Sequence, residues 1–339
     1  MQFLYGPFAP HFNALLYKIF GIQLGTLKVS GAVCAILILL MIYWLSRRLM
    51  SAWESAAVTG LVLVICAIKS TANYIQPYAY AALYGFLFSL SSLVCTVKFV
   101  LVRQSKLMLC AGIFAGLALI SKPEIALAGW AATAVVLLAE SLSDRKALGR
   151  EALNFILPVV VIFLLSYGFI LSRTPLSVLL NDNHVLFTNM PPQLVYFNRH
   201  ISGLAKLPIS LWFSLTGIAV FGVWAGASAL VGSALSFRRQ NWLQSLRLSA
   251  LVLLISAVLR EAAIKFLNVP DDVTPFASAI FAMPVVIGIV GWRIWKAWRN
   301  GQTVSTEQRI LLALTVFSLF SILRALLNVT TTGPYTPFF

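Results

Sequence analysis

A lysine and a glutamate on either side of a proline are the residues of this sequence best suited to bind an anion. Lys122, Pro123 and Glu124 interrupt an otherwise apolar stretch from Leu107 to Ala139. Proline disfavours a helix that continues through it, and Glu124 would lie near the positive end of the next helix. A cation at such a helix break could bind a headgroup or a phosphate. Alternatively, Lys122 snorkels from a solvated hairpin turn, and the sequence leaves both interpretations open.

Three charged residues lie close together near the end of another apolar run, Arg260, Glu261 and Lys265. The plainer interpretation is an internal ion pair that fixes helix packing, because charges in apolar surroundings usually satisfy each other. The alternative is that Arg260 clamps a phosphate, for which its planar guanidinium is suited.

Carboxylates and histidines in predicted loops are weaker candidates for a metal site. Asp271 and Asp272 could accept a proton or hold a divalent cation, but adjacent residues on a turn rarely converge on one ligand, which favours a hydrophilic turn. Asp182, His184 and His200 lack a metal-binding spacing, so their segment is better interpreted as a loop that covers a substrate. A divalent cation is the one cofactor that the sequence leaves open.

The elements that must position these residues are apolar helices. Of the 339 residues, 60% are hydrophobic and only 10% are charged, against about 25% charged in soluble proteins. Charge-free runs near or above ~18 residues are typical of membrane spans. Such runs cover residues 29–46, 70–97, 152–172, 207–237 and 273–292. The sequence therefore predicts an all-α, polytopic integral membrane protein.

About ten transmembrane helices are expected, preceded by an outer-face segment over residues 1–28. The helical domain would cover 29–339 and include a long outer loop over 173–207. The short second, fourth and fifth spans are typical of helices that line a cavity. The predicted spans are 29–48, 53–69, 79–100, 107–121, 124–141, 152–172, 208–235, 246–266, 274–296 and 309–327.

The basic residues predict the orientation and exclude nucleic acid as a partner. The net charge is +15, but the basic residues occur in short clusters between apolar runs and form no stripe with interleaved aromatics. Clusters such as Arg47–Arg48 and Arg238–Arg239 lie on one side, which the positive-inside rule makes cytoplasmic. Glu140 and Glu151 fall on the same side as interface charges. Both termini would then face the periplasm of a bacterial inner membrane.

The first twenty residues predict an amphipathic helix. Pro10 suits its first turn and Gly21 its C-terminal stop. One apolar stripe at helical spacing comprises Phe8, Phe12, Leu15, Leu16, Ile19 and Phe20. The remaining positions carry His11, Asn13, Tyr17 and Lys18. We expect this helix to lie on the outer membrane surface.

Glycine pairs and cysteines in the apolar runs predict packing and no chemistry. Gly112 with Gly116, and Gly222 with Gly226, are GxxxG pairs that favour close helix contact. The cysteines have neither a disulfide nor a metal spacing and are interpreted as small packing residues. They are Cys34, Cys66, Cys95 and Cys110.

Two stretches resemble a known family. Residues 5–21 read YGPFAPHFNALLYKIFG and residues 112–124 read GIFAGLALISKPE. They resemble the polyprenyl-phosphate-sugar-dependent membrane glycosyltransferases of the GT-C superfamily, which include protein mannosyltransferases and the aminoarabinose transferase that modifies lipid A. In that family, a Gly-Pro stretch with aromatics opens an amphipathic helix in the first outer loop. A glycine- and leucine-rich span ends there in Thr/Ser-Lys-Pro-Glu.

The resemblance implies sugar transfer from undecaprenyl or dolichyl phosphate to a protein, lipid or glycan acceptor on the outer face, with membrane lipids as surroundings. Lys122, Arg260 and Arg324 would bind the carrier phosphate and stabilise the leaving charge. The family places its catalytic aspartate upstream of the Gly-Pro stretch, so this residue is expected upstream of Met1. The implied donor and acceptor pocket comprises Tyr5, His11, Glu124, His184, Asp271 and Asp272.

Two other functions stay open at this point. A flippase or other transporter of lipid-linked oligosaccharides would carry charges at mid-span and related halves, whereas the charges here lie near the outer ends and no internal repeat is clear. An O-antigen polymerase or ligase would share the large outer loop and the lipid donor. The Gly-Pro segment before the first span counts against that assignment.

Overall fold

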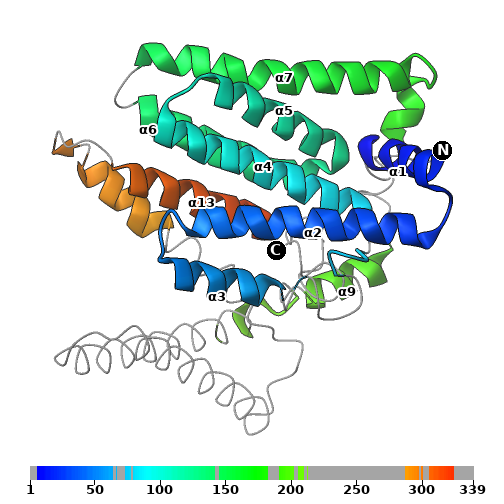
Figure 1. Cartoon of the computed structure of the whole chain (residues 1–339), viewed down its shortest axis with the longest axis horizontal. Coiled ribbons are helices and arrows are strands. Elements are labelled where there is room, and N and C mark those ends of the chain that lie inside the picture. Colours follow the sequence, from blue (N-terminus) through cyan, green and yellow to red (C-terminus); the bar gives the residue numbers. More distant parts are fainter. Residues whose placement is uncertain are drawn as a thin grey trace, which may run out of the picture. The chain divides into compact units, whose positions relative to one another are not determined.

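In the part that it describes, the computed structural model consists of helices with short connections and contains no strand, which confirms the all-α prediction (Figure 1). The described residues are 6–63, 66, 73–77, 79–141, 145–181, 191–201, 205–209, 212, 287–297, 299–300 and 305–323. The helices are α1 (Phe8–Phe20), α2 (Leu24–Ser46), α3 (Ala52–Val62), α4 (Tyr80–Val102), α5 (Lys106–Ser121), α6 (Pro123–Ser141), α7 (Arg145–Leu171), α9 (Pro192–Ile201) and α13 (Thr306–Leu323).

Five of these helices are long and apolar enough to cross a membrane, and α5 is a shorter apolar helix. The five long helices are α2, α4, α6, α7 and α13. This confirms a multi-pass membrane protein. The predicted span at 246–266, and most of the spans at 208–235 and 274–296, fall outside the described residues, so the count of ten stays a prediction. The second predicted span, 53–69, contains the short helix α3, which ends at Val62.

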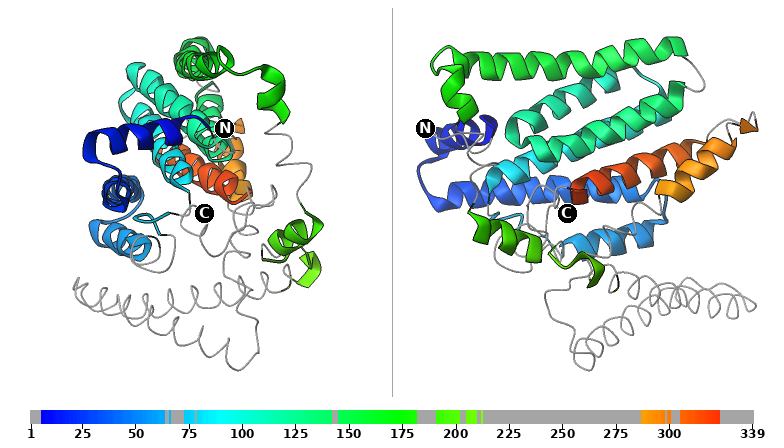
Figure 2. Two further views of the ribbon diagram at one scale, coloured as in Figure 1. Left: turned by 90° about the vertical axis from the view of Figure 1, so that its right-hand side faces the viewer. Right: turned by 180° about the vertical axis from the view of Figure 1, so that it is seen from behind.

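The chain divides into two compact units, residues 1–198 with 283–339 and residues 199–282. The first unit contains α1 to α7 and α13. Within it, α4 contacts α1, α2, α5, α6 and α13 (Figures 1 and 2). The second unit has few described residues, so the site is built from the first.

Hydroxyl groups tie α4 to its neighbours within the apolar bundle. Ser89 Oγ donates to the carbonyl of Ile125 (3.1 Å) and accepts from the N–H of Gly129 (3.1 Å). The hydroxyls of Thr96 and Thr133 lie 2.8 Å apart. Hydrogen bonds between small polar side chains and facing helices are typical of membrane bundles. They therefore fix how α4 and α6 lie against each other.

The packing of α5 on α7 confirms the role predicted for the first glycine pair. A Cβ added to Gly112 would lie 2.2 Å from the carbonyl oxygen of Phe155, and one added to Gly116 would lie 3.0 Å from Cδ1 of Ile162. No larger residue fits at Gly112 without moving backbone. The second pair, Gly222 with Gly226, lies outside the described residues.

Two buried carboxylates join several helix ends at one end of the first unit. Glu140, near the end of α6, accepts hydrogen bonds from Arg103, next to the end of α4, and from Nη1 of Arg309 in the first turn of α13 (2.8 Å). Glu151 of α7 accepts from Ser105 Oγ, just before α5 (2.6 Å). These described charged residues therefore lie at one end of the first unit, which we call the basic end.

Candidate functional site

Lys122 is the single residue between α5 and α6, and its backbone forms hydrogen bonds with both helices. Its N–H donates to the carbonyl of Ala118 (2.8 Å), which closes α5. Its carbonyl accepts from the N–H groups of Ile125 (3.0 Å) and Ala126 (3.2 Å), which opens α6. Its backbone is extended, because Pro123 disfavours a helical residue before it. The lysine therefore stands at a rigid helix break.

The side chain of Lys122 is buried. The residue is 2% exposed, and its Nζ lies 3.2 Å from Oε1 of Glu124, whose side chain is 22% exposed. The alternative of a solvated hairpin turn with a snorkelling lysine is therefore wrong. A buried ammonium is costly unless it is paired, and Glu124 provides a pair from the first turn of α6, where the helix dipole also favours a negative charge.

A glycine of α4 makes room for Lys122. A Cβ added to Gly85 would lie 3.1 Å from Cβ of Lys122, which is tighter than ordinary contact. Gly85 was not singled out in the sequence, because an isolated glycine in an apolar run carries no signal of what approaches it. Its lack of a side chain allows the helix break to lie directly against α4.

The two family-like stretches meet at this helix break. A Cβ added to Gly6 would lie 2.0 Å from the carbonyl oxygen of Ile120, so the chain two residues before α1 lies against the last turn of α5. Phe8 and Phe12 stack on each other with centroids 5.3 Å apart, and Phe8 packs edge-on against Phe88 of α4. The start of α1 is thereby held beside Lys122.

A hydrogen-bonded network anchors α1 to α2 and α4. The buried Tyr84 hydroxyl donates to Oδ1 of Asn13 (2.8 Å) and lies 3.0 Å from the hydroxyl of Ser30. The sequence placed Asn13 on the face opposite the apolar stripe. In the structure Asn13 faces the protein, and Leu15 and Ile19 of the stripe are 50% and 60% exposed. A helical wheel shows that a helix has two faces but not which neighbours each face contacts.

An apolar groove of about 450 Å³ lies beside the helix break, between α1, the end of α5 and α7. Its lining residues are Pro7, Phe8, His11, Phe12, Leu15, Ile120, Leu165, Ser166, Phe169 and Ile170. His11 Nδ1 lies 2.7 Å from the carbonyl oxygen of Pro7, which fixes the imidazole at the groove. The site thus combines the buried Lys122, the partly exposed carboxylate of Glu124 and an apolar groove.

Comparison with known proteins identifies the family of this arrangement. Residues 5–170 match the family model described as dolichyl-phosphate-mannose-protein mannosyltransferase. The match runs from just before α1 almost to the end of α7, and includes both stretches that meet at Lys122. This match supports a membrane glycosyltransferase of the GT-C type. No curated protein and no solved structure matches it.

Three of the residues predicted for this glycosyltransferase site fall within the described part. Lys122 and Glu124 form one ion pair, and His11 lines the neighbouring groove. The other predicted residues lie outside the described residues: Tyr5, His184, Arg260, Asp271, Asp272 and Arg324. The part of the chain that the structure describes has no group of three or more His, Cys, Asp or Glu that could hold a metal, and the divalent cation stays a prediction.

Proposed function

We propose that this glycosyltransferase moves a sugar from a polyprenyl phosphate carrier to an acceptor on the outer face of the membrane, and that Lys122 binds the carrier phosphate. The observation that carries the proposal is a buried lysine at a helix break, within an apolar bundle of the GT-C type. Burying a cation is costly, and binding of an anionic ligand offsets that cost.

The chemistry of the transfer gives the lysine its role. When an acceptor oxygen attacks the anomeric carbon, the bond from that carbon to the phosphate oxygen breaks and polyprenyl phosphate leaves with the electron pair. A preorganised cation in a poorly solvated site stabilises this leaving charge strongly. Glu124 is the more exposed partner of the pair, so it can move aside or share the ammonium when the phosphate binds.

The apolar groove beside the helix break suits the isoprenoid tail of the carrier. It is lined almost entirely by apolar side chains, and its volume of about 450 Å³ falls in the usual range of ~300–1,000 Å³ for ligand sites. His11 lies at the groove, and together with Tyr5 it would flank the path of the acceptor. Arg260 and Arg324 remain proposed additional contacts to the phosphate.

The separation of charges supports the orientation that we propose. The basic end holds Arg103, Arg150 and Arg309 at ends of helices, and the positive-inside rule favours this end as cytoplasmic. Lys122 lies at the opposite end of α5 from Lys106. The proposed site would therefore open to the periplasm, from which the acceptor would bind.

The test is Lys122→Gln, with transfer of radiolabelled sugar from a synthetic polyprenyl phosphate sugar measured in membranes. Loss of one preorganised charge contact should lower kcat about a hundredfold or more. Lys28→Gln changes an exposed lysine at the same end and should keep transfer within about twofold, as surface substitutions usually do. Full transfer by Lys122→Gln, at a normal melting temperature, would remove Lys122 from the site.

A further inference from the structure

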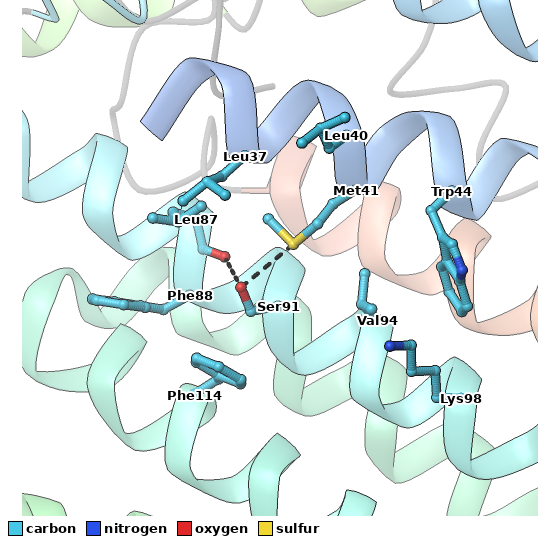
Figure 3. Close-up of a pocket in the computed structure, with 10 residues that line it drawn as sticks. All are labelled: Leu37, Leu40, Met41, Trp44, Leu87, Phe88, Ser91, Val94, Lys98 and Phe114. Atoms are coloured by element: carbon cyan, nitrogen blue, oxygen red, sulfur yellow. Dashed lines mark hydrogen bonds between the residues drawn. The ribbon is translucent and has the colours of Figure 1, made fainter. Parts of the chain in front are cut away.

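A second groove, on another face of the first unit, has one charged end. It lies between α2 and α4 with one residue from α5, and has a volume of about 430 Å³ (Figure 3). Its lining residues are Leu37, Leu40, Met41, Trp44, Leu87, Phe88, Ser91, Val94, Lys98 and Phe114. The Ser91 hydroxyl donates within the groove wall, to the carbonyl of Leu87 (2.8 Å). Along most of its length, therefore, the groove offers only apolar contact.

Two cations and an indole gather at one end of this groove. Cζ of Arg48 lies 4.1 Å and Nζ of Lys98 lies 5.5 Å from the ring centroid of Trp44. Figure 3 shows Lys98 and Trp44 side by side at that end. Among the described residues, neither cation forms an ion pair with a carboxylate. Tryptophan and basic side chains at a helix end are typical of the headgroup level of a membrane.

This groove is separate from the proposed transfer site. Gly85, which contacts Lys122, and Lys98 are both in α4 and are thirteen residues apart in the sequence. At 1.5 Å per residue this separates them by about 20 Å along the helix. One phosphate cannot contact both lysines, so a ligand at Lys98 is a different molecule from a carrier bound at Lys122.

We infer that the groove of α2 and α4 binds an anionic phospholipid of the leaflet at the basic end. The phosphate would lie between Lys98 and Arg48 beside Trp44, because basic pockets between membrane helices recognise such headgroups. One acyl chain would lie along Met41 and Phe88. The charge complementarity selects an anionic headgroup, while the uncharged remainder of the groove selects a hydrocarbon chain.

The test measures lipid binding to the purified full-length chain in detergent by native mass spectrometry, with dioleoyl phosphatidylglycerol and dioleoyl phosphatidylcholine as probes. The unmodified chain should retain phosphatidylglycerol more tightly. Lys98→Gln should weaken phosphatidylglycerol binding about fivefold, the effect of one basic residue near a headgroup, and leave phosphatidylcholine unchanged. Lys98 is exposed, so this substitution leaves the fold intact.

Lys106→Gln is the matched control. Lys106 is an exposed lysine at the same end of the bundle, and it does not line the groove. Its substitution should change phosphatidylglycerol binding by less than about twofold. Ser91→Leu places extra bulk in the groove without altering a charge, and should weaken phosphatidylglycerol binding with Lys98 still present.

Several results would overturn the inference. Equal losses of phosphatidylglycerol binding in Lys98→Gln and Lys106→Gln would mean that the basic surface attracts anionic lipids in general, without a specific site. Equal retention of both lipids would mean that the charged end selects nothing. Unchanged binding by Ser91→Leu, at a normal melting temperature, would place the acyl chain elsewhere. Displacement of phosphatidylglycerol by undecaprenyl phosphate at lower concentrations than by phosphatidylglycerol itself would assign the groove to the carrier.

Discussion

The two ends of the helical unit each contain a carboxylate paired with a buried cation, but the pairs are built differently. At the proposed transfer site, Lys122 and Glu124 are two residues apart, and Glu124 is partly exposed. At the basic end, Glu140 accepts from Arg103 and Arg309, which belong to different segments. The first pair is local and leaves one partner near solvent, whereas the second clamps the ends of α4, α6 and α13.

The two ion pairs therefore have different roles. Both carboxylate oxygens of Glu140 already accept from guanidinium groups, Oε2 from Arg103 and Oε1 from Arg309, so this carboxylate serves to join three helix ends. The carboxylate of Glu124, which pairs with Lys122, is partly exposed. We therefore expect the clamp to govern stability and the local pair to govern binding.

The largest effect should come from Glu140→Gln. This change leaves Arg309, which is 6% exposed, with an uncompensated buried charge, and breaking a buried pair costs about 3–5 kcal/mol. Thermal unfolding in detergent, followed by circular dichroism, should show a large fall in melting temperature. Glu54→Gln, at an exposed position, is the control and should have little effect. A melting temperature equal to that of the control would mean that the clamp contributes nothing.

A smaller loss should follow from Glu124→Gln, and a ligand should reverse it. The change removes the carboxylate that pairs with the Lys122 ammonium, and loss of a hydrogen bond to a charged group costs about 1–3 kcal/mol. Polyprenyl phosphate should restore the melting temperature of this variant by supplying the missing anion, because a ligand stabilises the state that it binds. The same ligand should raise the melting temperature of Glu140→Gln only as much as that of the unmodified chain. An equal rise in all three proteins, or a larger rise in Glu140→Gln, would contradict the division between a binding pair and a structural clamp.

The smallest of these effects should come from Tyr84→Phe, which tests how α1 is held beside the transfer site. The change removes a hydroxyl that contacts Asn13 and Ser30, and a hydrogen bond contributes about 1 kcal/mol. Limited proteolysis should cut near Gly21 faster in this variant. Tyr43→Phe alters a tyrosine that is 36% exposed and should leave the cleavage rate unchanged. Equal cleavage of the two variants would show that the hydroxyl does not anchor α1.

The membrane class and most helix bounds could be predicted from the sequence, because apolar runs and proline act locally. The predicted spans at 79–100 and 107–121 correspond to α4 and α5 within two residues at each end, and Pro123 marks the break before α6. Lys122 could be selected as a candidate because a cation in an apolar run is rare. The outer helix was predicted from its spacing, and α1 covers Phe8–Phe20.

Only the tertiary structure decided whether Lys122 is buried or solvated. The answer depends on Gly85 of α4 and on Gly6 before α1, which are distant in sequence from Lys122 and lie against the helix break. The same holds for the inward face of Asn13 and for the contact between Glu140 and Arg309. Periodicity reports the polarity of a helix face, since it depends on the helix alone. Which neighbour covers that face is set by packing among helices that no local pattern encodes.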